Sequence, residues 1–202
     1  MSLTDQQLHQ AFAAFDAANR EDPNHELVDG QPQPKELLYA QRMTHQLNEF
    51  CAAASTVVQL AARAQHICRW KIPRADYPMD RAGYHRWRTD LGTFHAETAA
   101  AILTAQGIDV ELIERVKLLL QKRKLKQDPE VQLLEDVICL VFIRYYLADF
   151  ARKHDEEKLL DIIRKTWRKM SLKGQEAALT LPLSAELNEL IIKALTPDNH
   201  AG

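Results

Sequence analysis

The sequence predicts an all-α protein, a single-domain bundle of seven or eight helices. Three observations support this fold class. The 202 residues include only six glycines, helix-favouring residues such as alanine, leucine and glutamate dominate, and the polar–apolar alternation typical of strands is almost absent. A hydrophobic content of 46% is sufficient for one core. We expect that domain to cover residues 1–196 and a disordered tail to follow at 197–202.

Capping residues and prolines place the predicted helices along the chain. Candidate starts are Thr4, Pro34, Ser55, Asp90, Asp109, Asp128-Pro129, Asp155 and Ser184. The first helix is expected to end near Asn19, and the helix from Asp128-Pro129 to extend through Phe150. Residues 20–34 contain three prolines and are predicted to form a turn-rich connector. The prolines at positions 73 and 78 predict a long ordered loop over 70–89.

Composition excludes several classes of protein. A net charge of -2 gives no global attraction to nucleic acid or to an anionic membrane. The three cysteines form no CxxC pair and are typical of buried thiols in a reducing compartment. The longest apolar run, residues 137–143, is too short to cross a bilayer. We therefore expect a soluble cytoplasmic protein without a membrane partner. The sequence contains no Gly-rich phosphate loop, nucleophile elbow or zinc-finger spacing.

Residues 65–95 hold the most informative pattern, because cationic and aromatic side chains alternate there. Guanidinium forks and aromatic faces suit anionic, planar ligands. We therefore predict that this segment roofs a polar cleft and binds a small anionic or phosphate-bearing ligand. The predicted ligand-binding residues are Arg69, Trp70, Arg74, Tyr77, Arg81, Arg88 and Lys122. Lys122 belongs to a basic cluster at a helix C-terminus, a position that the helix dipole alone also favours for cations.

Two histidines and two acids are candidates for chemistry. His66 lies opposite the apolar stripe of its predicted helix, so it is either a surface histidine or a group facing the cleft. His95 is either a packed, capping histidine or a ligand. Glu135 and Asp136 precede an apolar run on a helix that should be buried, where a carboxylate needs a partner. That partner is either an arginine or tyrosine of the basic loop or a metal ion.

Two resemblances add to these patterns. The stretches DAANREDPN, PKELLYAQRM, QHICRWKIPRADYPMDRAGYHRWR and LEDVICLVF resemble the family labelled domain of unknown function 4202, which implies a shared fold. More distantly, FHAETAAAILTAQGI and DPEVQLLEDVICLVF are similar to HD-type metal phosphohydrolases, which are all-helical. This second resemblance places the last aspartate ligand of that superfamily at Asp136 and one histidine at His66. Ile67 replaces the adjacent aspartate, and Tyr39 stands near the position of the first histidine.

The HD-like resemblance implies a divalent metal ion and hydrolysis of a phosphate ester. It implies catalytic roles for His66 and Asp136, and metal ligation by His66, His95, Glu135 and Asp136. The leading hypothesis is therefore a phosphate-handling, nucleotide-binding protein that acts as a metal-dependent phosphohydrolase. The alternative is a non-catalytic interaction module whose arginines and aromatics bind an acidic protein or RNA. A third reading is structural, with the loop arginines neutralising acids inside the domain.

Overall fold

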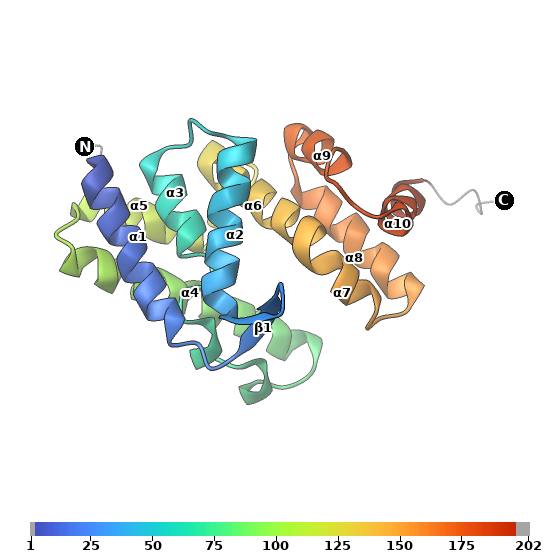
Figure 1. Ribbon diagram of the computed structural model, residues 1–202, viewed down its shortest axis with the longest axis horizontal. Helices are drawn as coiled ribbons and strands as arrows, with labels where there is room; N and C mark the ends of the chain where they lie inside the picture. The colour runs from blue at the N-terminus through green and yellow to red at the C-terminus, as the bar shows by residue number, and fades with distance from the viewer. Residues whose placement is uncertain (1–2, 197–202) are drawn as a thin grey trace. The chain divides into compact units, whose positions relative to one another are not determined.

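The computed structural model describes residues 3–196, so the predicted tail at 197–202 lies outside the described residues. The chain divides into two compact units, residues 1–134 and residues 135–202, and each is described by itself. That the two units act as a single domain stays a prediction. The all-α prediction is confirmed, since the described part of the chain holds ten α-helices and one two-stranded sheet (Figure 1). No helix within residues 3–196 is both long and apolar enough to cross a membrane.

Five complete helices and a hairpin build the first unit. They are α1 (Asp5–Arg20), β1 (His25–Val28), β2 (Gln31–Pro34), α2 (Lys35–Phe50), α3 (Thr56–Arg63), α4 (Arg81–Ala105) and α5 (Val110–Leu120). Thr4, Ser55 and Asp109 cap helices as predicted. Helices α1, α2 and α3 pack against one another, and α5 packs against α3 and α4. Fully buried Phe15, Met43 and Leu119 belong to the core of this unit.

The predicted connector at 20–34 contains a β-hairpin. Strands β1 and β2 pair antiparallel, with His25 opposite Pro34 and Val28 opposite Gln31. Asp29 and Gly30 form the two-residue turn, and both have positive φ angles, 51° and 77°. An Asp-Gly pair favours this type of turn, because glycine and aspartate adopt left-handed conformations at low cost.

The loop predicted over 70–89 is shorter in the structure. Two 3-10 turns, η1 (Arg69–Lys71) and η2 (Arg74–Asp76), follow α3, and α4 begins at Arg81 instead of near Asp90. Asp80 caps α4 by accepting a hydrogen bond from the Gly83 backbone N–H at 2.6 Å. A Cβ atom at position 83 would lie 2.1 Å from the Pro78 carbonyl oxygen, so glycine lets the proline turn pack against the helix start.

The second unit is also helical. It holds the end of α6 (Pro129–Val141), the π-helical turn η3 (Phe142–Tyr146), α7 (Leu147–Ala151), α8 (Glu156–Lys169), α9 (Leu172–Leu179) and α10 (Ala185–Leu195). Two features raise the helix number above the seven or eight predicted. The π turn divides the helix expected up to Phe150, and α9, capped by Ser171, was not expected. Asp155 and Ser184 cap α8 and α10 as predicted.

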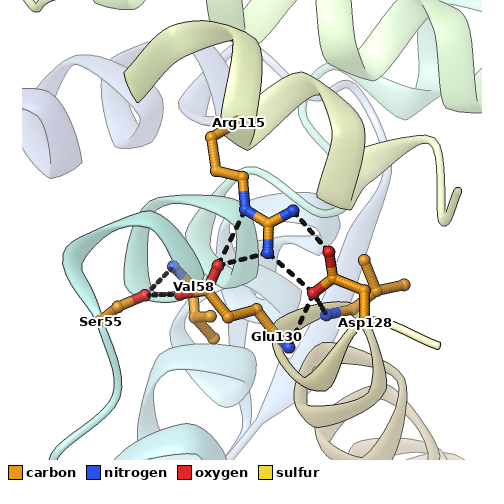
Figure 2. Close-up of polar contacts among 6 residues, drawn as sticks. Ser55, Val58, Arg115, Asp128 and Glu130 are labelled. Atoms are coloured by element: carbon orange, nitrogen blue, oxygen red, sulfur yellow. Dashed lines mark hydrogen bonds and ion pairs between the residues drawn. The ribbon is translucent and has the colours of Figure 1, made fainter. Parts of the chain in front are cut away.

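An ion-pair cluster ties both ends of the α5–α6 loop together in the first unit. The Arg115 guanidinium donates to both carboxylate oxygens of Asp128 at 2.6 and 2.7 Å and to Glu130 at 2.6 Å (Figure 2). Ser55, the N-cap of α3, donates to the same Glu130 carboxylate. Hydrogen bonds from Arg115 lower the pKa of Asp128 to about 2. The cluster therefore fixes the start of α6 against α3 and α5.

Replacing Arg115 by methionine should lower the free energy of unfolding by about 2 kcal/mol, because two carboxylates lose their charged donor. Unfolding in urea, followed by tryptophan fluorescence, measures the change. Arg152→Met is the matched control, since Arg152 forms an exposed ion pair with Asp149 and its loss should cost about 0.5 kcal/mol or less. Equal losses for the two variants would contradict the clamping role of Arg115.

Candidate functional site

A tight turn at residues 64–68 places the first candidate side chain. Helix α3 ends at Arg63, and Cys68 has a left-handed φ of 51°. The Cys68 backbone N–H donates to the side-chain oxygen of Asn19 at 3.0 Å. The neighbouring Ile67 carbonyl accepts a hydrogen bond from His95 Nδ1 at 2.8 Å. The turn is thus held from two directions, by α1 and by α4.

His66 bridges a carboxylate and a guanidinium. Its Nδ1 lies 3.2 Å from Glu36 Oε2, and its Nε2 lies 2.9 Å from Arg69 Nη1. A guanidinium only donates hydrogen bonds, so Nε2 is the acceptor. Nδ1 therefore carries the ring proton and donates a hydrogen bond to the Glu36 carboxylate. Tyr39, which the HD-like resemblance places near a first histidine ligand, stacks on the His66 ring at a centroid distance of 3.9 Å.

Burial and charge keep this histidine neutral. Burial lowers the pKa of His66 well below 6.5, and the positive charge of Arg69 lowers it further. For Glu36, burial raises the pKa from 4.5 to about 7, although Arg69 acts in the opposite direction. The Glu36 backbone N–H donates to the buried Asp22 carboxylate at 2.9 Å. That bond caps α2, where Pro34 provides no capping side chain.

His95 is also neutral and is 3% exposed. Since its Nδ1 donates to the Ile67 carbonyl, its Nε2 carries a lone pair and no proton. Burial lowers the pKa of His95 to about 3, so Nε2 stays unprotonated and able to accept a hydrogen bond throughout the physiological range. The His66 and His95 rings lie 5.9 Å apart between centroids.

A cavity of about 370 Å³ lies beside these histidines in the first unit. One wall comes from the turn after α3, one from the end of α5, and one from a face of α4 whose residues recur every three or four positions. Its titratable lining residues are His66, Arg69, His85, Arg88, His95, Lys122 and Arg123. Four of these are permanent cations, and no carboxylate among the described residues lines the cavity.

Lys122 occupies a position that usually belongs to glycine. After α5 its N–H donates to the Leu119 carbonyl at 2.9 Å, and the next N–H, of Arg123, donates to the Leu118 carbonyl at 3.3 Å. This is the Schellman pattern, whose central residue is left-handed, and Lys122 has a φ of 53°. A side chain with a Cβ is strained in this conformation. Lys124 and Lys126 in the same loop are also left-handed, with φ angles of 64° and 67°, but of these three lysines only Lys122 lines the cavity.

The structure places the seven predicted ligand-binding residues in two groups. Arg69, Arg88 and Lys122 line the cavity, and the other four, Trp70, Arg74, Tyr77 and Arg81, are not among its lining residues. The Arg74 guanidinium donates to the carbonyls of Tyr77 and Asp80, and the Tyr77 hydroxyl donates to Asp90. These hydrogen bonds hold the ordered turns before α4.

Glu135 and Asp136 belong to the second unit, where both are 3% exposed. Asp136 accepts hydrogen bonds from the Ser171 backbone N–H at 2.8 Å and from its hydroxyl at 2.5 Å. A Cβ at Gly174 would lie 2.8 Å from the same carboxylate, so glycine permits this approach to α9. Lys169 lies 3.9 Å from Glu135. Asp136 therefore has a structural role at the start of α9, and the catalytic and metal roles of both acids stay predictions.

The donor set does not fit the metal ion that the HD-like resemblance implies. Across residues 3–196, no three histidine, cysteine, aspartate or glutamate side chains gather in a way that could hold one. In addition, His66 Nε2 faces a guanidinium, which repels a cation and occupies the lone pair. We therefore derive no reaction step through a metal.

Sequence reasoning identified His66, Arg69, Arg88, His95 and Lys122 but missed other parts of the site. In the sequence, Glu36 is an ordinary acid in the first turn of α2. Only folding brings it into contact with the imidazole of His66, 30 positions further along the chain. The α4 residues His85 and Thr89 fell in a segment that was predicted to be a loop. Their spacing from Gly92 and His95 would have indicated one helix face if the cap at Asp80 had been recognised.

The fold and the cavity define a mostly helical protein with a basic, histidine-lined pocket. Residues 9–191 match the family described as Domain of unknown function (DUF4202), and the chain belongs to that family. No curated protein and no solved structure matches the chain significantly. The resemblance to HD-type phosphohydrolases stays a prediction.

Replacing Glu36 by glutamine should change how stability depends on pH. Between 4.5 and about 7 the unfolded chain has released the Glu36 proton and the folded chain retains it, so wild-type stability falls as pH rises. Above that window the folded protein carries a buried charge at a cost on the order of 3 kcal/mol. Glutamine at position 36 still accepts a hydrogen bond from His66 Nδ1–H. The free energy of unfolding of the Glu36→Gln variant, relative to that of wild type, should therefore rise by this amount from about pH 4 to about pH 8.

Urea unfolding at a series of pH values tests this expectation. Glu49→Gln is the control, because Glu49 lies on the same helix with its side chain 44% exposed, and it should track wild type. If the Glu36→Gln and wild-type curves run parallel, Glu36 is not the buried titrating group.

Proposed function

We propose that the protein binds a small phosphate-bearing anion, such as a nucleotide or another phosphate ester, in the cavity of its first unit. One observation carries this proposal: four cationic side chains, Arg69, Arg88, Lys122 and Arg123, line the cavity without a lining carboxylate. An ordinary basic cluster is interleaved with acids, as Arg115 is with Asp128 and Glu130. A concave, partly enclosed site lined by cations and by no carboxylate favours an anionic ligand.

Arg69 shows why an anion can bind without first breaking an ion pair. Its cavity-side partner is the neutral His66 ring, and its guanidinium also lies over the Trp87 ring, 4.9 Å from the centroid. By contrast, Arg63 is held by a bidentate contact with Asp16 at 2.6 and 2.8 Å. A phosphate that replaces the imidazole as the acceptor for Arg69 gains a charged hydrogen bond and leaves His66 Nε2 free.

The cavity size limits the ligand. A volume of about 370 Å³ falls within the range of small-molecule sites and exceeds the space that a bare phosphate needs. The ligand is therefore a phosphate with an organic group attached. We propose that the cavity binds this ligand, and we assign no hydrolysis to it, because the side chains present do not fit a catalytic metal ion. A cytoplasmic location is also part of the proposal.

A second candidate function uses the outer surface of α4. Met79, just before α4, is 80% exposed and Tyr84 is 46% exposed, and Arg81 and Arg86 of the same segment are also exposed. This patch has the composition of an interaction module for RNA or an acidic protein. Arg86 and Arg88 therefore separate the two functions, because both are exposed on α4 and only Arg88 lines the cavity.

Arg88→Ala should weaken binding of pyrophosphate and AMP by about tenfold, because one charged hydrogen-bonding group is lost. Arg86→Ala should leave it unchanged. Isothermal titration calorimetry at two salt concentrations measures both, and wild-type affinity should fall with salt. A lack of binding by any phosphate compound would exclude the proposed function. Loss of RNA binding in Arg86→Ala with no phosphate binding in wild type would favour the interaction module.

Lys122→Gly should change stability and affinity in opposite directions. Glycine removes the strain of the left-handed conformation and should stabilise the fold by about 1 kcal/mol. The same variant loses one cavity cation, so pyrophosphate should bind several-fold more weakly. Thermal unfolding and calorimetry on the same samples give both quantities. Unchanged affinity in a stabilised variant would show that Lys122 has no part in anion binding.

A further inference from the structure

Two hydrogen-bond acceptors in the cavity wall are buried without a partner among the described residues. They are Gln65 Oε1 and His95 Nε2, and their residues are 5% and 3% exposed. Buried polar atoms in folded proteins are almost always paired, because an unpaired one loses its hydration without compensation. Two such atoms on residues that line one cavity are therefore informative about what binds there.

Both atoms require a donor. His95 Nδ1 is committed to the Ile67 carbonyl, so Nε2 is the ring nitrogen without a proton. The nearby guanidinium of Arg69 is turned to His66 Nε2 at 2.9 Å. The wall thus presents two kinds of group: cations that favour an anion, and acceptors that need O–H or N–H donors. Sulfate, pyrophosphate or a simple alkyl phosphate satisfies the first kind and leaves the acceptors unpaired.

We propose that the ligand is a phosphate ester whose organic part carries hydroxyl groups, a polyhydroxy phosphate, and that His95 Nε2 and Gln65 Oε1 are the acceptors that select it. This inference rests on the proposed anion-binding function and adds the chemistry of the uncharged end. The phosphate binds at the cavity cations, which are Arg69, Arg88 on α4, and Lys122 and Arg123 at the end of α5. The hydroxyls donate to the two acceptors, which lie at the start of the Gln65–Cys68 turn and on α4.

The test compares phosphate esters of equal charge. Isopropyl phosphate and glycerol 2-phosphate differ only by two hydroxyl groups, and ribose 5-phosphate and glucose 6-phosphate extend the series. At least one polyhydroxy ester should bind the full chain about tenfold more tightly than isopropyl phosphate, as expected when a buried acceptor gains a donor. Equal binding by all esters would overturn this inference and leave the anion site intact. Binding by none would overturn the anion site itself.

Variants assign the preference to the two acceptors. His95→Asn keeps an amide N–H near the position of Nδ1, which preserves the bond to Ile67, and deletes Nε2. Gln65→Met deletes the other acceptor at similar volume. Each should reduce the tenfold ratio between polyhydroxy ester and isopropyl phosphate affinities, whereas His45→Phe, on the exposed side of α2, should retain this ratio. A preference that persists in both acceptor variants would overturn the assignment.

A spectroscopic measurement on wild type covers the case in which these variants fail to fold. In a ¹⁵N-detected histidine spectrum, His95 Nε2 should have the shift of an unprotonated nitrogen. Glycerol 2-phosphate or ribose 5-phosphate should move this resonance in the direction of an accepted hydrogen bond, and isopropyl phosphate should not. If the Nε2 shift is the same with every ester, His95 does not contact the hydroxyls.

Discussion

The hydrogen bond from His95 Nδ1 to the Ile67 carbonyl is the constraint on which the site depends. It joins the middle of α4 to the turn after α3, and the Asn19 side chain holds the next residue, Cys68, from the opposite side. The Ile67 carbonyl and the N–H of the left-handed residue Cys68 are both hydrogen-bonded, and these two bonds hold the turn in this conformation. That conformation directs the His66 ring toward Glu36 on one edge and Arg69 on the other. Buried polar atoms therefore fix the geometry here, and packing alone would not.

The order carboxylate, imidazole, guanidinium determines the charge that the cavity presents. If Glu36 contacted Arg69 directly, the pair would be neutral and the cavity would lose its attraction for anions. The neutral His66 ring separates them: its Nδ1–H donates to Glu36, and its Nε2 accepts a hydrogen bond from Arg69. The acid thus holds the histidine in one tautomer without lining the cavity, and Arg69 remains available. Such an arrangement tolerates the buried carboxylate because burial raises its pKa to about 7.

Local chemistry could be predicted from the sequence, and contacts between distant residues could not. The caps at Thr4, Ser55 and Asp109 were predicted because a capping side chain acts within three residues of its own position. The Asp29-Gly30 pair is also a local signal for a hairpin turn, but the prolines in residues 20–34 favoured the prediction of an irregular connector. Glu36 could not be identified, because its relation to His66 exists only after α2 and the α3 turn have packed.

The proposed anion binding would be linked to protonation at this site through Arg69. The positive charge of this residue lowers the pKa of both Glu36 and His66, so it opposes protonation of each. A phosphate bound to the guanidinium offsets that charge, and the proton affinity of both groups rises. Since linkage is reciprocal, protonation of Glu36 must in turn strengthen binding of the anion. If the cavity binds an anion as proposed, the carboxylate that holds His66 in place therefore also sets the pH range, near its own pKa of about 7, over which the affinity changes.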